Sequence, residues 1–340
     1  MHTSRVITVV GCHAEGEVGD VITGGVLPPA GATMLEKKLT MEREHDHIRR
    51  LLIREPRGSV ARHVNLIVPP TRADAQAGAI IMEPTEYPPM SGSNTMCITT
   101  VLLETGIVPM QEPETRMRLD MPGGPVDVVA ECRDGKCVSV TIANVPAFAA
   151  KLDAPLEVRG RGTIHVDIAY GGMFYAIADA RALGYEVRAD EARELAELGE
   201  AIRVAAREQH EVVHPEFPEI RGVSIVQLAA PFQGPNAISR NTCIVSPGRS
   251  DRSPTGTGTS ARMAVLHARG LLRAGEGFVH ESIIGSRFES TIAAEARVGD
   301  RPAIVPTIAG QAWITGVFQH GMDPSDPFRH GFTLPDMWFA

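Results

Sequence analysis

Two short segments with the same unusual composition constrain the possible fold of this chain most. Each places glycine and small hydroxyl residues where a helix is expected to begin. They are Pro-Met-Ser-Gly-Ser-Asn-Thr at 89–95 and Ser-Pro-Thr-Gly-Thr-Gly-Thr-Ser at 253–260. Ser91 and Thr255 are 164 positions apart, close to half of the 340 residues. Two similar α+β halves would explain this spacing, and two unrelated helix caps would explain it equally well.

Short apolar runs rich in β-branched residues alternate with turn residues, which indicates antiparallel hairpins. The clearest turns are Pro122 to Gly124 and Arg133 to Lys136. Helices are expected at 94–105, 191–209 and 260–269, and the first and third are followed by glycines suited to a helix end, Gly106 and Gly270. Strands are expected at 6–10, 64–68, 79–82, 126–130 and 138–142.

Composition excludes several classes of function. The net charge is −8, with 33 Lys+Arg against 41 Asp+Glu, and aromatic residues make up only 5%. No basic surface for nucleic acid is therefore expected. The apolar runs are too short for a membrane span or a signal peptide. The five cysteines form an odd number without CxxC spacing, which argues against disulfides and structural zinc and favours the cytoplasm.

The two helix starts could bind an anion. Backbone N–H groups at a helix N-terminus lack intrahelical acceptors and face the positive end of the helix dipole, so a substrate carboxylate could bind there. Gly92 and Gly256 leave room for close approach, and Ser91 and Thr255 would direct their hydroxyls at the bound group. Either hydroxyl could instead be an ordinary N-cap. Neither segment matches a Walker or dinucleotide-binding pattern.

Asp251 precedes Thr255 by four residues and could bind a substrate ammonium, pair with Arg252 or cap the loop. The twelve histidines show no HExxH pair, so no catalytic metal is expected. No GxSxG motif supports a hydrolase triad. Cys97 lies among apolar neighbours, where a buried, inert thiol is expected.

Ordered motifs along nearly the whole chain resemble the proline racemase family, and the string Asp-Arg-Ser-Pro-x-Gly-Thr-Gly is the most specific of them. They begin at His13 (HAEGE), Arg54 (REPRG), Glu83 (EPTEYPPMSGSNT), Asp167 (DIAYGGMFYA), Asp251 (DRSPTGTGTS), Ser282 (SIIGSRF) and Ala312 (AWITG).

The resemblance implies a fold like that of diaminopimelate epimerase: α+β, with two pseudo-symmetric domains that each wrap strands around a central helix. It places the active site in the cleft between them. We expect the first domain to comprise residues 1–128 and 300–340 and to carry Ser91. The second should comprise residues 129–299 and carry Thr255. The family resemblance also suggests a homodimer.

Racemases of this family have a cysteine at each helix start, where this chain has Ser91 and Thr255, and Ser93 replaces the usual histidine. Alkyl hydroxyls are far weaker acids than thiols, so two-base racemisation is not expected. Members with threonine at the second position resemble trans-3-hydroxy-L-proline dehydratases. In that substrate the α-hydrogen and the 3-hydroxyl share one ring face, so a single residue could act as base and then as acid.

The prediction is therefore a cofactor-independent dehydratase acting on a hydroxyproline-type imino acid, with Ser91 and Thr255 as catalytic residues. His13, Glu15 or Asp251 could help to activate Ser91. A 4-hydroxyproline 2-epimerase and a non-catalytic binder of proline-like amino acids are the alternatives. The residues expected to bind substrate are Gly92, Ser93, Asp251, Gly256 and Thr257.

Overall fold

The chain divides into two compact units in the computed structural model, which describes residues 3–335 and 337. The first unit comprises Met1–Ile142 and Gly310–Ala340, and the second comprises Ala143–Ala309. The expected boundaries, after residues 128 and 299, are displaced. Strands β6 (Gly124–Arg133) and β7 (Lys136–Ala143) form one hairpin, as do β15 (Arg287–Val298) and β16 (Arg301–Gly310). Each unit contains all the paired residues of its hairpin, up to Ile142 in the first and Ala309 in the second.

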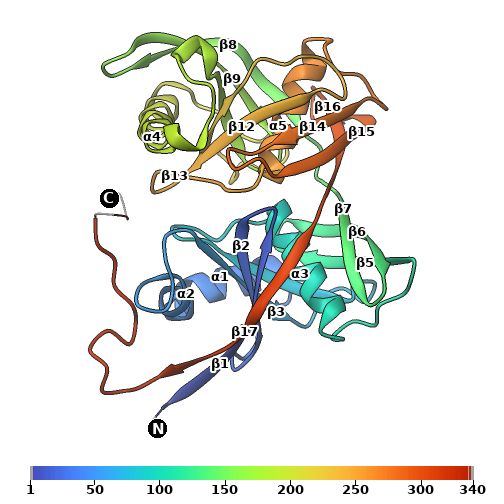
Figure 1. Cartoon of the computed structure of the whole chain (residues 1–340), viewed down its shortest axis with the longest axis vertical. Helices are drawn as coiled ribbons and strands as arrows, with labels where there is room; N and C mark the ends of the chain where they lie inside the picture. Colours follow the sequence, from blue (N-terminus) through green and yellow to red (C-terminus); the bar gives the residue numbers. More distant parts are fainter. Residues whose placement is uncertain (1–2, 336, 338–340) are drawn as a thin grey trace. The chain divides into compact units, whose positions relative to one another are not determined.

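The sheet of the first unit runs in the order β17–β1–β2–β3–β4–β5–β6–β7. Helices α1 (Met34–Glu44) and α2 (Asp46–Ile53) connect β2 to β3, and α3 (Gly92–Glu104) connects β4 to β5 (Figure 1). The remaining strands are β1 (Arg5–Ala14), β2 (Glu17–Gly24), β3 (Arg62–Val68), β4 (Ala77–Met82), β5 (Glu114–Met121) and β17 (Ala312–Met322).

The sheet of the second unit runs in the order β8–β9–β10–β11–β12–β14–β15–β16. Helix α4 (Ala192–Gln209) lies between β10 and β11, and α5 (Gly256–Ala268) between β12 and β14. The strands are β8 (Phe148–Val158), β9 (Gly162–Tyr170), β10 (Phe174–Asp179), β11 (Ile225–Ala229), β12 (Ile238–Val245), the short β13 (Arg249–Ser250) and β14 (Gly277–Glu281).

The two units share one topology. Along the order given for each sheet, successive pairs are antiparallel, antiparallel, parallel, antiparallel, parallel, antiparallel and antiparallel. Helices α3 and α5 follow equivalent strands, so the two similar segments of the sequence start equivalent helices. The duplication that the sequence left open is therefore confirmed, as is the expected α+β fold class.

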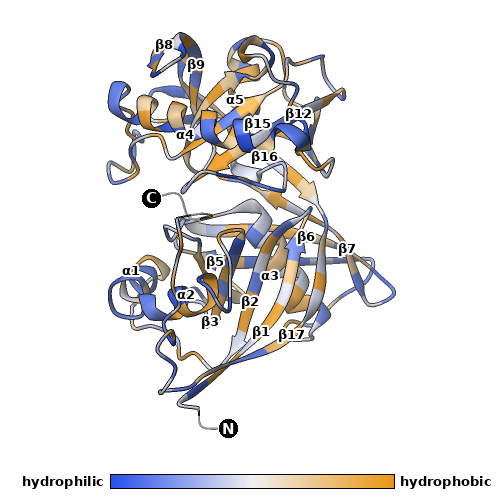
Figure 2. Ribbon diagram, turned by 60° about the vertical axis from the view of Figure 1, so that its left-hand side comes forward, coloured by the Kyte–Doolittle hydropathy of each residue, from blue (hydrophilic) through white to orange (hydrophobic). Residues whose placement is uncertain are grey.

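A central helix is buried in each unit. All residues of α3 from Gly92 to Leu103 are buried, and so is most of α5. Both helices are built largely from small, apolar and hydroxyl residues, because strands pack around them and leave no polar face. Helix α4 has separate hydrophobic and hydrophilic sides (Figure 2), and its buried side includes Leu195, Leu198 and Ile202. A core of apolar residues packs beneath α4 and another beneath α1 and α2.

The predicted strands and helices are confirmed, with bounds that differ by a few residues. Gly106 and Gly270 follow the ends of α3 and α5 with φ of +74° and +70°, as expected for helix-terminating glycines. Helices α1 and α2 were missed, although Thr33 and Glu36 form a capping box at the start of α1. Among the described residues, no helix is long and apolar enough to cross a membrane.

Candidate active site

Ser91 is the N-cap residue of α3, but its side chain does not cap the helix. Its backbone carbonyl accepts hydrogen bonds from the N–H and the hydroxyl of Thr95, at 2.9 and 2.7 Å. The hydroxyl Oγ instead accepts a hydrogen bond of 3.0 Å from Asn94 Nδ2. Within the described part of the chain, no residue accepts the Ser91 hydroxyl proton. Ser91 therefore occupies the N-cap position without capping the helix through its hydroxyl; Asn94 holds its oxygen from one side, and the residue is half-buried.

A buried polar network lies behind Ser91. Asn94 Nδ2 is also 3.1 Å from Nδ1 of His63, and Asn94 Oδ1 accepts a hydrogen bond of 2.9 Å from Asn65 Nδ2. His63 Nε2 lies 3.4 Å from Glu17 Oε1, and His63 Nδ1 lies 3.6 Å from Glu83 Oε1. All five side chains are buried. Such a cluster is costly to bury unless its members satisfy one another, which makes it a candidate for function.

This network was not predicted from the sequence. His63 and Asn65 alternate along β3, where apolar residues surround them, so they share the face of the sheet that packs against α3. Polar residues at a period of two within an apolar strand were the available signal. His13 and Glu15, which were expected to assist Ser91, lie at the β1–β2 turn, and their assistance to Ser91 stays a prediction. His13 Nδ1 accepts from Gly16 N–H at 3.2 Å, and Glu15 Oε1 accepts from Gln311 N–H at 3.0 Å.

Thr255 has a different environment. Its hydroxyl donates a hydrogen bond of 2.6 Å to Asp251 Oδ2, and it does not cap α5. Its φ is +66°, a value that β-branched residues rarely adopt. Ser253 supports this conformation: its Oγ accepts from Thr255 N–H at 3.1 Å and donates to Asp251 Oδ1 at 2.9 Å. Asp251 also accepts from Ser253 N–H, at 2.8 Å. The carboxylate thus organises the loop that holds Thr255 in a strained conformation.

The start of α5 lies close to the turn between β9 and β10. A Cβ on Gly171 would lie 2.2 Å from the carbonyl oxygen of Thr257, so only glycine fits there. Thr257 Oγ1 is hydrogen-bonded to the Tyr175 hydroxyl at 2.6 Å, so this predicted substrate-binding residue is engaged through its side chain. Gly256 and Thr257 are buried in the second unit, and Gly92 and Ser93 are buried in the first.

Neither thiol near the two hydroxyls suits a base. Burial raises the pKa of Cys97, which lies on α3 close to Gly19, well above its usual value. Burial also raises the pKa of Cys243 to about 12, against a smaller lowering effect of a hydrogen bond with Thr255. Both thiols are therefore protonated at neutral pH, as expected for Cys97 from the sequence. The described cysteines are all free and buried.

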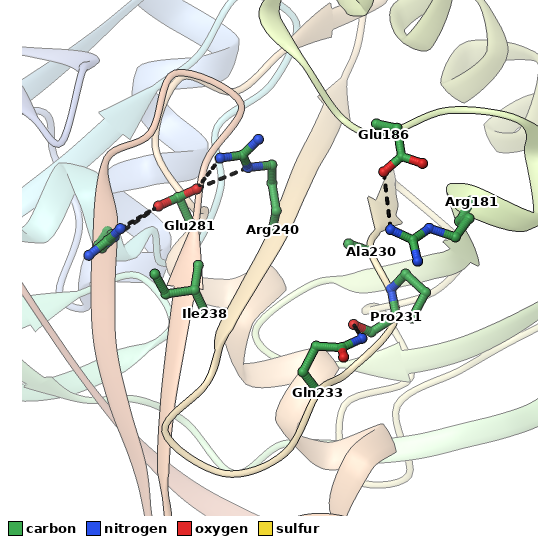
Figure 3. A pocket seen from close by; sticks show the side chains of 9 residues that line it. Arg181, Glu186, Ala230, Pro231, Gln233, Ile238, Arg240 and Glu281 are labelled. Atoms are coloured by element: carbon green, nitrogen blue, oxygen red, sulfur yellow. Dashed lines mark hydrogen bonds and ion pairs between the residues drawn. The ribbon is translucent and has the colours of Figure 1, made fainter.

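A pocket of about 460 Å³ in the second unit contains none of the predicted site residues. Figure 3 shows that its charged side chains point toward one another. Glu281 Oε1 lies 2.5 Å from Arg240 Nη2, and Glu281 Oε2 lies 2.8 Å from Arg287 Nη2. Burial alone would raise the pKa of Glu281, but the two guanidinium groups outweigh it and lower that pKa. Arg181 pairs with Glu186 at 3.1 Å.

Among the described residues, no group of three or more His, Cys, Asp or Glu side chains is placed to hold a metal.

Comparison with known proteins gives close matches. The family model "Proline racemase" matches residues 9–333. A crystal structure of a hydroxyproline epimerase from Agrobacterium vitis with bound trans-4-OH-L-proline is 40% identical, with a TM-score of 0.93, and the match covers 100% of this chain and 99% of that chain. A probable proline racemase from Agrobacterium radiobacter K84 with bound carbonate is 41% identical, with a TM-score of 0.92 and 98% coverage of both chains. A PhzF-family phenazine biosynthesis protein from Bacillus anthracis, 12% identical with a TM-score of 0.57, covers 93% of this chain and 99% of its own length and shares the fold alone.

Proposed function

Because the chain belongs to the proline racemase family, we propose that it dehydrates trans-3-hydroxy-L-proline to pyrroline-2-carboxylate without a cofactor, with Ser91 as the group that removes the α-proton. The observation that carries this proposal is the asymmetry of the two hydroxyls. Ser91 accepts a hydrogen bond and keeps its own proton uncommitted, whereas Thr255 donates its proton to Asp251. Dehydration needs acid–base chemistry on one ring face only, and this asymmetry suits it.

In the proposed reaction, Ser91 acts as the alkoxide, after its hydroxyl proton has passed to solvent. It takes the proton from Cα, and the electron pair of the broken C–H bond forms the double bond between Cα and C3. Ser91 then passes this proton to the 3-hydroxyl, which leaves as water, and the alkoxide is restored. The resulting enamine gains a proton at C3 and loses its N–H proton, which gives pyrroline-2-carboxylate. Thr255 contributes a hydrogen-bonding group and exchanges no proton with the substrate.

Two features support Ser91 as a base. Asn94 donates to its oxygen at 3.0 Å, and a donor in this position stabilises the alkoxide more than the hydroxyl. Ser91 also lies at the positive end of α3, whose first N–H groups lack intrahelical acceptors. The same N–H groups could bind the substrate carboxylate and so stabilise the developing charge at Cα, a preorganised electrostatic effect. Gly92 and Ser93 are the residues proposed to bind it in the first unit, and Gly256, Thr257 and Asp251 in the second.

A second candidate is a 4-hydroxyproline 2-epimerase. A hydroxyproline epimerase with bound trans-4-OH-L-proline is 40% identical to this chain over its full length, which favours this alternative. Epimerisation requires a proton donor on the second face of the ring. Thr255 would then have to release its bond to Asp251 and deliver a proton, with Asp251 as the group that restores it. The homodimer and the cytoplasmic location stay predictions.

The test is incubation of the purified protein with trans-3-hydroxy-L-proline, cis-3-hydroxy-L-proline, trans-4-hydroxy-L-proline and L-proline. Pyrroline-2-carboxylate is followed by coupled reduction, and inversion at Cα by optical rotation. We expect pyrroline from the trans-3 isomer alone, and its loss in Ser91→Ala. Inversion of the 4-hydroxy isomer without pyrroline would overturn the proposal in favour of the epimerase. Tight binding with no reaction of any kind would indicate a binder.

A further inference from the structure

The hydrogen bonds around Asn94 have a fixed direction. The Asp20 carbonyl oxygen can only accept, and it lies 3.2 Å from Asn65 Nδ2, so this contact orients the Asn65 amide. Asn65 Nδ2 then also donates to Asn94 Oδ1, which orients the Asn94 amide in turn. The two Nδ2 hydrogens of Asn94 therefore point to Ser91 Oγ and to His63 Nδ1.

The direction of the hydrogen bonds around Asn94 also sets the tautomer of His63. Because Asn94 Nδ2 can only donate, His63 Nδ1 must accept, and the imidazole proton is placed on Nε2, which faces Glu17. A proton on His63 Nδ1 would conflict with the Asn94 amide. The amide would have to turn and present Oδ1 to Ser91, whose hydroxyl proton would then be committed to Asn94. The orientation of Asn94 thus decides whether the Ser91 oxygen accepts or donates.

We propose that Asn94 and His63 are positioning residues for Ser91: together they keep the Ser91 oxygen as a hydrogen-bond acceptor, so that its proton is left for exchange with the substrate. The inference rests on the proposed role of Ser91 as the base. His63 acts through Asn94 and does not contact the reacting atoms. Glu17 faces the protonated Nε2 of His63 and holds the imidazole, whereas Glu83 Oε1 lies 3.6 Å from Nδ1, beyond hydrogen-bond distance.

Gly19 on β2 supports this arrangement. A Cβ at this position would lie 2.8 Å from Asn94 Oδ1 and 3.0 Å from Cys97 Sγ, closer than ordinary contacts. Glycine therefore leaves the space that the Asn94 amide occupies. Gly19→Ala should push Asn94 away from Ser91 without changing any polar group. Gly24→Ala on the same strand is a matched control, because its Cβ would make only ordinary contacts of 3.7 Å with Thr8.

Two substitutions of His63 separate a positioning role from a structural one. In His63→Asn the side-chain oxygen can take the place of Nδ1 and accept from Asn94, although the contact with Glu17 is lost. In His63→Gln the amide reaches toward Glu17 and leaves Asn94 without its acceptor. We expect His63→Asn to keep kcat within about threefold of the natural enzyme, and His63→Gln and Gly19→Ala to lower kcat about 10- to 100-fold with little change in KM. Thr99→Val, a buried change on α3 outside the network, should leave kcat unchanged.

A second measurement does not depend on any substrate. Nitrogen-15 NMR of the imidazoles, with His63 assigned by its loss in His63→Asn, should show the neutral tautomer with the proton on Nε2. Asn94→Asp should convert it to the imidazolium, since a carboxylate accepts from both Nδ1 and Ser91. An Nδ1–H tautomer in the natural protein, or equal losses of kcat in His63→Asn and His63→Gln, would overturn the inference. Failure of the proposed function would appear separately, as an inactive enzyme with the expected tautomer.

Discussion

The loop before α5 should depend on Asp251 for its stability. Asp251 is 5% exposed, and its carboxylate accepts hydrogen bonds from Ser253 N–H, the Ser253 hydroxyl and the Thr255 hydroxyl. Hydrogen bonds to a charged group contribute about 1.5–3 kcal/mol each, and an orphaned buried donor costs about 1–3 kcal/mol. The hydroxyls can rotate to other acceptors, but the backbone N–H cannot. We therefore expect Asp251→Ala to lower the free energy of unfolding by about 3–5 kcal/mol.

Asp251→Asn should cost only about 1–2 kcal/mol, because one oxygen still accepts from Ser253 and the new amide can donate to the Thr255 hydroxyl. Urea unfolding followed by circular dichroism, with linear extrapolation, measures both values. Asp300→Ala, an exposed change in the β15–β16 turn, is the control and should cost less than about 0.5 kcal/mol. If Asp251→Ala were no more costly than the control, the carboxylate would not organise the loop, and its role would be confined to the substrate.

Two further predictions concern the second unit. Gly171→Ala should prevent stable folding of this unit or strongly destabilise it, because the alanine Cβ would lie 2.2 Å from the Thr257 carbonyl oxygen. A thermal unfolding temperature close to that of the natural protein would contradict this prediction. Burial, with a smaller effect of Arg262, lowers the pKa of His280 from 6.5 to about 3. Between pH 3 and pH 6.5, His280 therefore binds a proton in the unfolded chain but not in the folded chain. The free energy of unfolding should be highest above pH 6.5 and should fall toward pH 3 by up to about 1.4 kcal/mol per pH unit. His280→Asn should flatten this dependence in urea titrations at several pH values, and an unchanged slope would refute the assignment.

The sequence predicted the fold well where the signal was local. Gly106 and Gly270 marked the ends of both central helices, and the 164-residue spacing of Ser91 and Thr255 indicated the duplicated unit. The family resemblance then supplied the fold class. The domain boundaries were displaced because strand pairing, which residue types do not reveal, keeps each hairpin within one unit.

The site was predicted less completely, because its organisation depends on contacts between distant segments. Ser91, Thr255 and Asp251 were identified as candidates, but an N-cap serine and a serine held by Asn94 have the same local sequence. His63 is 28 positions before Ser91 and joins it only through the packing of β3 against α3. The strained φ of Thr255 was equally inaccessible, since threonine rarely adopts a positive φ and only the surrounding loop imposes it.

The most direct test of the proposed chemistry is proton NMR of trans-3-hydroxy-L-proline incubated with the enzyme in D₂O. One-face dehydration by Ser91 predicts pyrroline-2-carboxylate that carries deuterium at C3, together with remaining substrate that is not inverted at Cα, and no reaction in Ser91→Ala. Inverted, Cα-deuterated substrate without pyrroline, or full activity in Ser91→Ala, would contradict the role proposed for Ser91.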